Sequence, residues 1–188
     1  KPLESYDDEN GEISLCTLSA INWGLIDSPK DFEKYCTLSV RALDNLLDYQ
    51  EYPIKAAEKS TMNRRPLGIG IINLAYFLAK RGLKYNEQSH EIIDEYAEAW
   101  SYYLIKASME LAEEKGACWL SDETKYASGK LPNDTYKGAV DNLVKRKSTL
   151  PWDTLRSALV EHGIRNSTLM ALMPAETSAQ ISNSTNGI

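Results

Sequence analysis

The sequence predicts a helix-rich α/β fold, and three observations support this prediction. Segments that alternate like strands and segments with a helical stripe of apolar residues follow one another along the chain. The helical segments are the longer ones. The composition, 43% hydrophobic and 26% charged, is that of an ordinary globular protein. The 188 residues are enough for one domain with its own core, so we expect residues 1–188 to belong to a single domain.

The first strand is expected within residues 12–24. In this stretch two sets of side chains alternate, Ile13, Leu15, Thr17 and Ser19 against Ser14, Cys16 and Leu18. A helix is expected over residues 30–49, because Ser28, Pro29 and Asp31 form a start signal. Its apolar residues recur at helical spacing, at Phe32, Cys36, Val40, Leu43 and Leu47.

The remaining elements follow from the same two patterns. In chain order they are a strand and a helix over 65–82, a helix over 88–115, short helical pieces and turns over 121–150, a helix over 153–161, a buried strand over 166–173 and a helix start over 176–182. Glycine ends three of these helices, at Gly82, Gly116 and Gly163.

The overall charge and the cysteine pattern exclude several classes of function. A net charge of −6 disfavours a broad surface for nucleic acid or anionic membrane. No apolar run approaches the ~20 residues that cross a bilayer, and no signal peptide is recognised. The three cysteines form no CxxC pair, and His90 and His162 lie in no metal-spaced motif. We therefore expect a cytoplasmic protein with no metal site and neither a membrane nor a nucleic-acid partner.

The two ends of the sequence suggest a piece of a longer chain. The first residue is Lys1, and the last residues, Gly187 and Ile188, follow a stretch of small polar residues. We expect either an experimental fragment or one product of a split gene.

The stretch "GIGIIN", residues 68–73, partly matches the glycine-rich fingerprint of dinucleotide-binding proteins. However, Asn73 stands where the third glycine belongs, and no acidic residue follows at the expected distance. Close packing of a strand against a helix is therefore the favoured interpretation of Gly68 and Gly70.

The three cysteines have different surroundings. Cys36 lies on an apolar helical stripe and Cys118 follows the end of the helix over 88–115, so both are expected to be packing residues. Cys16 lies among hydroxyl side chains in the first strand. This pattern alone favours a buried, inert thiol over a reactive one, although the reactive role stays open.

The stretch "PAETSAQ", residues 174–180, is a candidate anion site. Pro174 ends the expected strand, and the helix that starts after it leaves backbone N–H groups without helical partners. These donors and the helix dipole favour a phosphate, which small side chains allow to approach. Ordinary capping by serine or threonine explains the same residues equally well at this point.

Several longer stretches carry a family resemblance: "GEISLCTLSAINWG", "RALDNLLDYQEYP", "RRPLGIGIINLAYFLAK", "KASMELAEEKGAC" and "IRNSTLMALMPAETSAQISNSTNGI". They resemble the large, catalytic subunit of class I ribonucleotide reductase, especially its bacterial and phage members. The resemblance covers nearly the whole chain in the right order. It implies a ten-stranded α/β barrel built from two half-barrels, of which this chain would be much of the second half. It also implies the reduction of ribonucleoside diphosphates to deoxyribonucleoside diphosphates by thiyl-radical chemistry.

The resemblance implies roles for six residues. Cys16 would be one half of a redox-active disulfide, with its partner cysteine outside this chain. The substrate diphosphate would be held by a loop and helix start through backbone N–H groups and hydroxyls. This segment comprises Pro174, Ala175, Glu176, Thr177 and Ser178. Ala175 stands where the family usually has a serine, which removes a hydroxyl but keeps the N–H. Because the Glu176 carboxylate would repel a diphosphate, we expect it to turn aside.

The resemblance also implies partners. They are the remainder of the large subunit, a small subunit whose metal centre generates the radical, the ribonucleoside diphosphate substrate, and thioredoxin or glutaredoxin. The radical-bearing cysteine and the sites for nucleoside triphosphate effectors would lie outside this chain, which is expected to bind no cofactor and to be inactive alone. The alternatives are a catalytically inert helical scaffold that acts only in assembly, and a simple phosphate-binding module.

Overall fold

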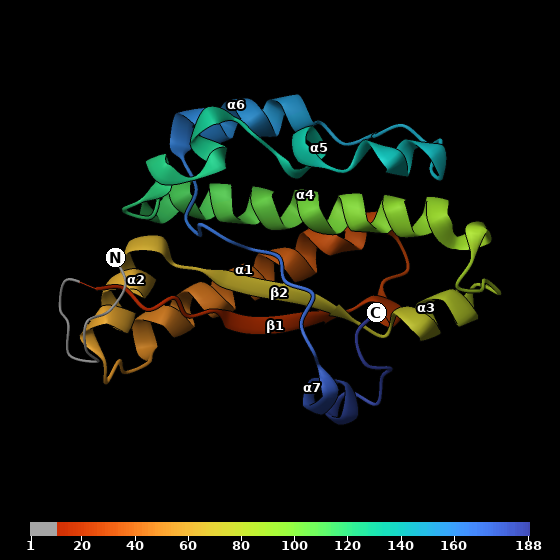
Figure 1. Ribbon diagram of the computed structural model, residues 1–188, viewed down its shortest axis with the longest axis horizontal. Coiled ribbons are helices and arrows are strands. Elements are labelled where there is room, and N and C mark those ends of the chain that lie inside the picture. Colours follow the sequence, from red (N-terminus) through yellow and green to blue (C-terminus); the bar gives the residue numbers. More distant parts are fainter. Residues whose placement is uncertain (1–10) are drawn as a thin grey trace.

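The computed structural model describes residues 11–188 of the chain. In this part of the chain, two parallel strands form the sheet (Figure 1). β1 (Thr17–Asn22) pairs in register with β2 (Leu67–Ile72) along its whole length. β1 is shorter than the expected strand over 12–24. The backbone before it has another partner, because Ile13 donates its N–H to the carbonyl of Ala56 at 3.1 Å.

A third extended segment lies along the other edge of β2, where a strand over 166–173 is expected. The N–H groups of Leu67 and Ile69 donate to the carbonyls of Thr168 and Leu169, at 3.0 and 2.8 Å. The donors are two residues apart but the acceptors are neighbours, so the even ladder of a parallel pair is broken. A single bridge, between Ile69 and Met170, remains. The expected full strand is therefore wrong, and the segment is an extended neighbour of β2.

Helices dominate the described residues, which confirms the helix-rich α/β fold. They are α1 (Phe32–Tyr49), α2 (Lys55–Arg64), α3 (Leu74–Lys80), α4 (His90–Lys115), α5 (Pro132–Thr135), α6 (Trp152–His162) and α7 (Glu176–Ile181). The expected helices over 30–49, 88–115 and 153–161 are confirmed, with small shifts at their ends. α2 has no counterpart among the expected elements.

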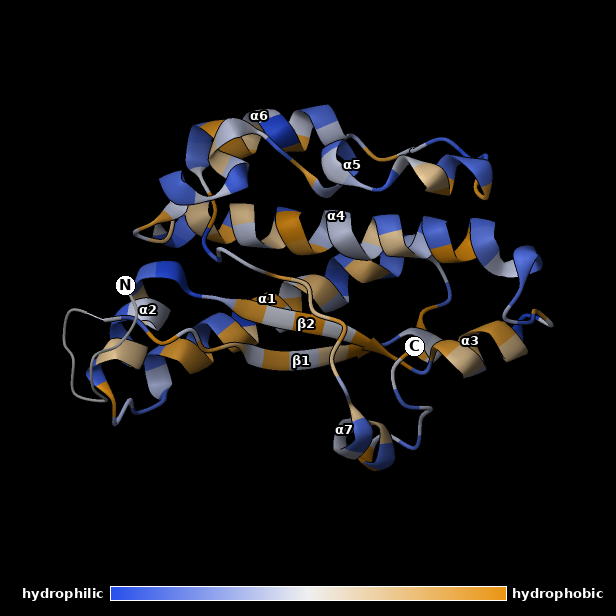
Figure 2. Cartoon of the chain, in the orientation of Figure 1, coloured by the Kyte–Doolittle hydropathy of each residue, from blue (hydrophilic) through white to orange (hydrophobic). Residues whose placement is uncertain are grey.

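The sheet, α1 and α4 share one hydrophobic core. α4 runs alongside α1 and the strands, and α5 and α6 lie on its far side (Figure 1). β2 is largely apolar along its length (Figure 2). The core combines side chains from each layer, among them Ile69, Ile71, Phe32, Cys36, Val40, Leu47, Leu104 and Leu111. Cys36 and Cys118 are buried, as expected for packing residues.

The two faces of the sheet have different surroundings. Ile69 and Ile71 of β2 point into the helical core. Because side chains alternate along a strand, Gly68 and Gly70 belong to the opposite face. Leu18 of β1 lies beside Gly68 on that face and is 49% exposed. This second face, which the helices of the core leave uncovered, also carries Cys16.

We expect the isolated 188-residue chain to be marginally folded and to bind an apolar dye, because its sheet leaves large apolar side chains in water. Leu18 is 49% exposed and Leu172 is 67% exposed. Changing both to serine should lower dye binding. The same change at Val160, 60% exposed on α6, serves as the control and should not. A single sharp unfolding transition without bound dye would contradict this expectation.

A buried ionic cluster lies where β2 and the third segment begin. Asp44 of α1 is fully buried and accepts hydrogen bonds from Arg65 Nε at 2.6 Å, Asn166 Nδ2 at 3.0 Å and Arg165 Nε at 3.3 Å. Arg65, also buried, donates to both carboxylate oxygens of Asp48 at 2.8 Å. The cluster therefore ties α1 to the amino ends of two neighbouring segments of the sheet.

Candidate functional site

The carboxyl ends of β1, β2 and the third segment lie together at one end of the sheet, and this end is the edge meant here. In open α/β sheets ligands bind outside the carboxyl ends of the strands. β1 ends at Asn22, β2 ends at Ile72 and the third segment reaches Pro174. α7 follows directly and lies on the side of the sheet away from α4 (Figure 1). We take this edge, together with the sheet face next to α7, as the candidate site.

α7 sits on the sheet through small side chains. Ala175 and Ala179 pack against Ile72, with Ala20 of β1 beside them. Because these alanines carry only a methyl group, the helix comes close to the strands. Ile72 belongs by alternation to the same face as Gly68 and Gly70. The helix therefore covers the carboxyl end of the otherwise open face.

The first turn of α7 offers backbone donors. The helix begins at Glu176, after Pro174, as expected. Its N-cap residue is Ala175, which provides no side-chain cap, so capping by serine or threonine is contradicted as an explanation of this stretch. Among residues 11–188, the N–H groups of Glu176, Thr177 and Ser178 have no acceptor. These groups are therefore available to an anion.

Cys16 lies on the open face of the sheet. It directly precedes β1 and is exposed. The expectation of a buried thiol, which the sequence pattern favours, is therefore wrong. A Cβ atom built on Gly68 would come within 2.7 Å of its Sγ, which places the thiol over β2 on the face opposite the helical core. Partial burial raises the pKa of the Cys16 thiol. The group is therefore a protonated thiol at neutral pH.

The other two thiols are packing groups. Cys36 is surrounded by the core and donates its S–H toward the carbonyl of Trp100, at 3.8 Å between sulfur and oxygen. Burial raises the pKa of both Cys36 and Cys118, which keeps these thiols neutral and unreactive. Cys16 is thus the exposed cysteine of the three, and the expected burial of Cys36 and Cys118 is confirmed.

Gly68 and Gly70 make room for side chains from neighbouring segments. A Cβ on Gly68 would lie 2.5 Å from Leu18 Cδ2, and one on Gly70 would lie 2.6 Å from Met173 Sδ. These neighbours come from β1 and the third segment, so the expected packing of a strand against a helix is wrong for these glycines. Both glycines also lie inside β2. The dinucleotide fingerprint needs them in the turn between strand and helix.

The predicted site residues share one face but lie at two ends of it. Cys16 precedes β1, and Ala20, four residues further along, contacts α7. At a rise of about 3.3 Å per residue, these positions are roughly 13 Å apart along the strand. The face between them is lined by Leu18, Gly68 and Gly70.

No sequence pattern assigns a role to Asn73, which lies at the same edge of the sheet. It is buried, and its Nδ2 donates to Asn22 Oδ1 at 2.9 Å. Its Oδ1 accepts a hydrogen bond from the backbone N–H of Thr185 at 3.0 Å. The one available sequence signal is its position between a strand and a helix, in a place where the dinucleotide fingerprint has glycine.

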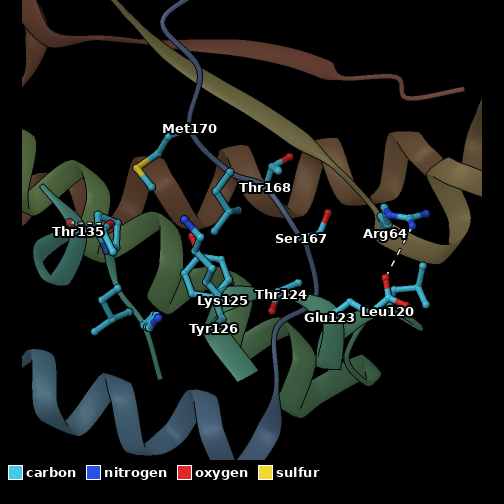
Figure 3. Close-up of a pocket in the computed structure, with 14 residues that line it drawn as sticks. Arg64, Leu120, Glu123, Thr124, Lys125, Tyr126, Thr135, Ser167, Thr168 and Met170 are labelled. Atoms are coloured by element: carbon cyan, nitrogen blue, oxygen red, sulfur yellow. Dashed lines mark hydrogen bonds and ion pairs between the residues drawn. The ribbon is translucent and has the colours of Figure 1, made fainter. Parts of the chain in front are cut away.

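A separate cavity of about 560 Å³ lies at the outer edge of the sheet, beyond the third segment (Figure 3). Thr168 and Met170 line one side, and Tyr126 from the turns after α4 lines the other. At one end Arg64 forms an ion pair with Glu123 at 3.9 Å. Cys16 and residues 174–178 lie elsewhere, so this cavity is distinct from the candidate site.

The described residues include neither a membrane-spanning helix nor a cluster of metal-ligating side chains. From residue 11 to residue 188, no helix is long and apolar enough to cross a membrane. In the same range, no group of three or more histidine, cysteine, aspartate or glutamate side chains is arranged to hold a metal ion.

Comparison with known proteins identifies relatives over the whole length of the chain. The family model described as "Ribonucleotide reductase, barrel domain" matches residues 3–188. The ribonucleoside-diphosphate reductase subunit alpha of Buchnera aphidicola (subspecies Schizaphis graminum) is 54% identical over 189 aligned positions, which cover 100% of this chain and 25% of that protein. The corresponding subunit of Haemophilus influenzae is also 54% identical, with the same coverage.

A phage protein extends the similarity. The ribonucleoside-diphosphate reductase subunit alpha of Enterobacteria phage T4 is 44% identical over 189 positions, covering 99% of this chain and 25% of the phage protein. The chain thus spans about a quarter of the length of these relatives.

Proposed function

The chain belongs to the ribonucleotide reductase barrel-domain family, and from this premise we propose that it supplies part of the active site of a ribonucleoside-diphosphate reductase. One observation carries the proposal. The acceptor-free N–H groups of the first turn of α7 lie on the same open sheet face as the exposed thiol of Cys16. The first feature suits the diphosphate of the substrate, and the second suits the redox step.

The proposed diphosphate site is the segment from Pro174 to Ser178. Three backbone N–H groups, of Glu176, Thr177 and Ser178, would donate to phosphate oxygens, with the Thr177 and Ser178 hydroxyls beside them. Such charge-assisted hydrogen bonds contribute roughly 1.5–3 kcal/mol each. The donors are already fixed by the helix, so binding requires little reorganisation.

The proposed roles of Ala175 and Glu176 differ from those of the donors. Ala175 donates its own N–H to Asn186 and packs its methyl group against the sheet. Its proposed contribution is therefore to position the helix. Glu176 is exposed at the first position of α7, where the helix dipole favours an acidic side chain. We propose that its carboxylate turns away from the diphosphate.

The proposed role of Cys16 is that of a reductant. In the reaction the 2′-hydroxyl of the ribose leaves as water, and two thiols supply the two electrons. Their sulfurs lose their protons and form a disulfide, which thioredoxin or glutaredoxin then reduces. Cys16 would be one of these thiols, and the other would come from the part of the protein outside this chain. The protonated state of Cys16 fits a donor of both protons and electrons.

The proposed setting is a ten-stranded α/β barrel, to which residues 1–188 contribute much of the second half. In that setting the open sheet face would point to the barrel interior. The proposed partners are the remainder of the large subunit and a small subunit whose metal centre generates the radical. Nucleoside triphosphate effectors would bind to parts of the protein outside this chain. The proposed location of the protein is the cytoplasm.

Changing Thr177 to proline in the complete α subunit tests the diphosphate site. Proline removes one N–H donor and is tolerated in the first turn of a helix. Losing one charge-assisted hydrogen bond should raise the KM for a ribonucleoside diphosphate about tenfold or more. The measurement is steady-state kinetics after assembly with the radical-generating subunit.

Thr177→Val is the matched control for this test. It keeps the N–H group and removes only the hydroxyl, so its effect on KM should be smaller. If Thr177→Pro leaves both KM and kcat unaltered, residues 174–178 do not bind the diphosphate. A scaffold role for this segment would then be the better explanation.

A further inference from the structure

We propose that Asn73 is a positioning residue that fixes the first turn of α7 against the carboxyl ends of β1 and β2. The inference rests on the proposed diphosphate site at residues 174–178. It adds a residue that touches no substrate but determines where the binding donors lie.

Asn73 occupies a position that normally serves a different purpose. It is the N-cap residue of α3, where an asparagine side chain usually accepts a hydrogen bond from its own helix. Here there is no such bond, and the backbone is left-handed, with φ of 69°. Asparagine tolerates this region better than most residues, but it remains a strained conformation. The side chain is therefore held in place by contacts outside α3.

Those contacts join three segments of the chain. Asn73 Nδ2 donates to Asn22 Oδ1 at the end of β1, at 2.9 Å. Asn73 Oδ1 accepts from the Thr185 backbone N–H at 3.0 Å and from its hydroxyl at 3.4 Å. The Asn73 backbone N–H donates to the Thr185 carbonyl at 2.9 Å. Asn73 is only 6% exposed, so its own end of these bonds is buried, whereas Thr185 is exposed.

Gly24 leaves a space for the Asn73 side chain. A Cβ atom on Gly24 would lie 2.3 Å from Asn73 Nδ2 and 2.9 Å from its Cγ. Any larger residue at Gly24 would therefore displace the amide. The absence of a side chain at this position keeps Asn73 in contact with Asn22 and Thr185.

The loop held by Asn73 in turn holds both ends of α7. Asn186, next to Thr185, accepts the Ala175 N–H on its Oδ1 at 3.0 Å. Ser184 donates its N–H to the carbonyl of Ala179 at 2.9 Å. Asn73 is therefore connected, through Thr185 and the adjacent Asn186, to the residue before Glu176. Loss of the Asn73 side chain should let the first turn of α7 shift relative to the sheet.

Asn73→Gly in the complete α subunit tests the inference. Glycine adopts the left-handed backbone without strain, so the change removes the side chain alone. We expect the KM for a ribonucleoside diphosphate to rise about tenfold, with a smaller change in kcat, as for the loss of one or two neutral hydrogen bonds. Binding of the corresponding nucleoside, which has no phosphate, should change little.

Two further variants separate positioning from general damage. Asn183 is also left-handed, with φ of 49°, but is exposed at the other end of α7, so Asn183→Gly is the matched control and should leave KM unchanged. Asn186→Ala, at an exposed position, breaks the series elsewhere and should raise KM in the same way, even if Asn73→Gly does not fold.

The outcomes distinguish this inference from the proposed function. If Thr177→Pro raises KM but Asn73→Gly and Asn186→Ala do not, the positioning role is wrong and the diphosphate site stands. If none of the three raises KM, the diphosphate site itself is wrong and the inference falls with it. An equal loss of affinity for diphosphate and nucleoside would identify a merely structural role and overturn the inference.

Discussion

Changing Cys16 to serine in the complete α subunit is expected to abolish sustained turnover with a thiol reductant and to leave the affinity for the ribonucleoside diphosphate unchanged. A serine hydroxyl has nearly the size of the thiol but forms no disulfide, so the two electrons cannot be delivered. Because Cys16 is exposed and its Sγ lies over a glycine, the substitution should not disturb packing. Substrate binding and repeated turnover, measured on the same preparation, check both parts.

Cys36→Ser and Cys118→Ser are the matched controls. Both thiols are buried, and burial raises the pKa of each, so neither is expected to exchange electrons with the substrate. These variants should lose some stability, because a hydroxyl replaces a buried sulfur, but should keep repeated turnover. Sustained turnover by Cys16→Ser would exclude Cys16 from the redox pair. Equal loss in all three variants would point to damage to the fold.

Long amphipathic helices are the part of this fold that the sequence predicts best. The apolar stripes of α1 and α4 each contribute many contacts to the core, so local pattern and tertiary structure agree. α2 is different: its sequence is mostly polar and only Ala56, Ala57, Ser60 and Thr61 are buried. A helix with so small an apolar side has no clear periodicity, and its existence depends on the contacts around it.

For side chains of the sheet, burial is harder to predict from sequence than alternation between the two faces. The alternating pattern correctly separates Cys16 from Thr17, but it does not tell which of the two faces the helices cover. Cys16 is exposed because α1 and α4 pack on the opposite face. For the same reason, the glycines of β2 accommodate strand neighbours instead of a helix. Which face is covered is decided by tertiary packing and not by local sequence.

The start of α7 after Pro174 is predicted well because its signals are local. A proline followed by small polar residues specifies both the end of an extended segment and the start of a helix. The contacts of Asn73 are not local, since its partners are separated from it by 51 residues at Asn22 and 112 residues at Thr185. Contacts of this kind become visible only in the folded chain.

A second large effect is expected from Asp44→Asn, at the buried ionic cluster. The carboxylate of Asp44 is fully buried and accepts hydrogen bonds from Arg65, Asn166 and Arg165. An amide would place an N–H₂ group against these donors and leave buried positive charge without its main partner. Removing one partner of a buried ion pair costs about 3–5 kcal/mol. The denaturant midpoint of the complete subunit, and hydrogen exchange around α1 and residues 164–168, should both report the loss.

Asp48→Asn provides the matched control, because Asp48 binds the same Arg65 but its side chain is 48% exposed. Water screens this pair, so its loss should cost less than about 1 kcal/mol. The hydrogen bonds from Arg65 hold the pKa of Asp48 below its ordinary value of 3.8. Its contribution should therefore be complete above about pH 4 and disappear as the pH falls through the lowered pKa. Equal effects of the two substitutions at neutral pH would show that burial of Asp44 does not determine the strength of the cluster.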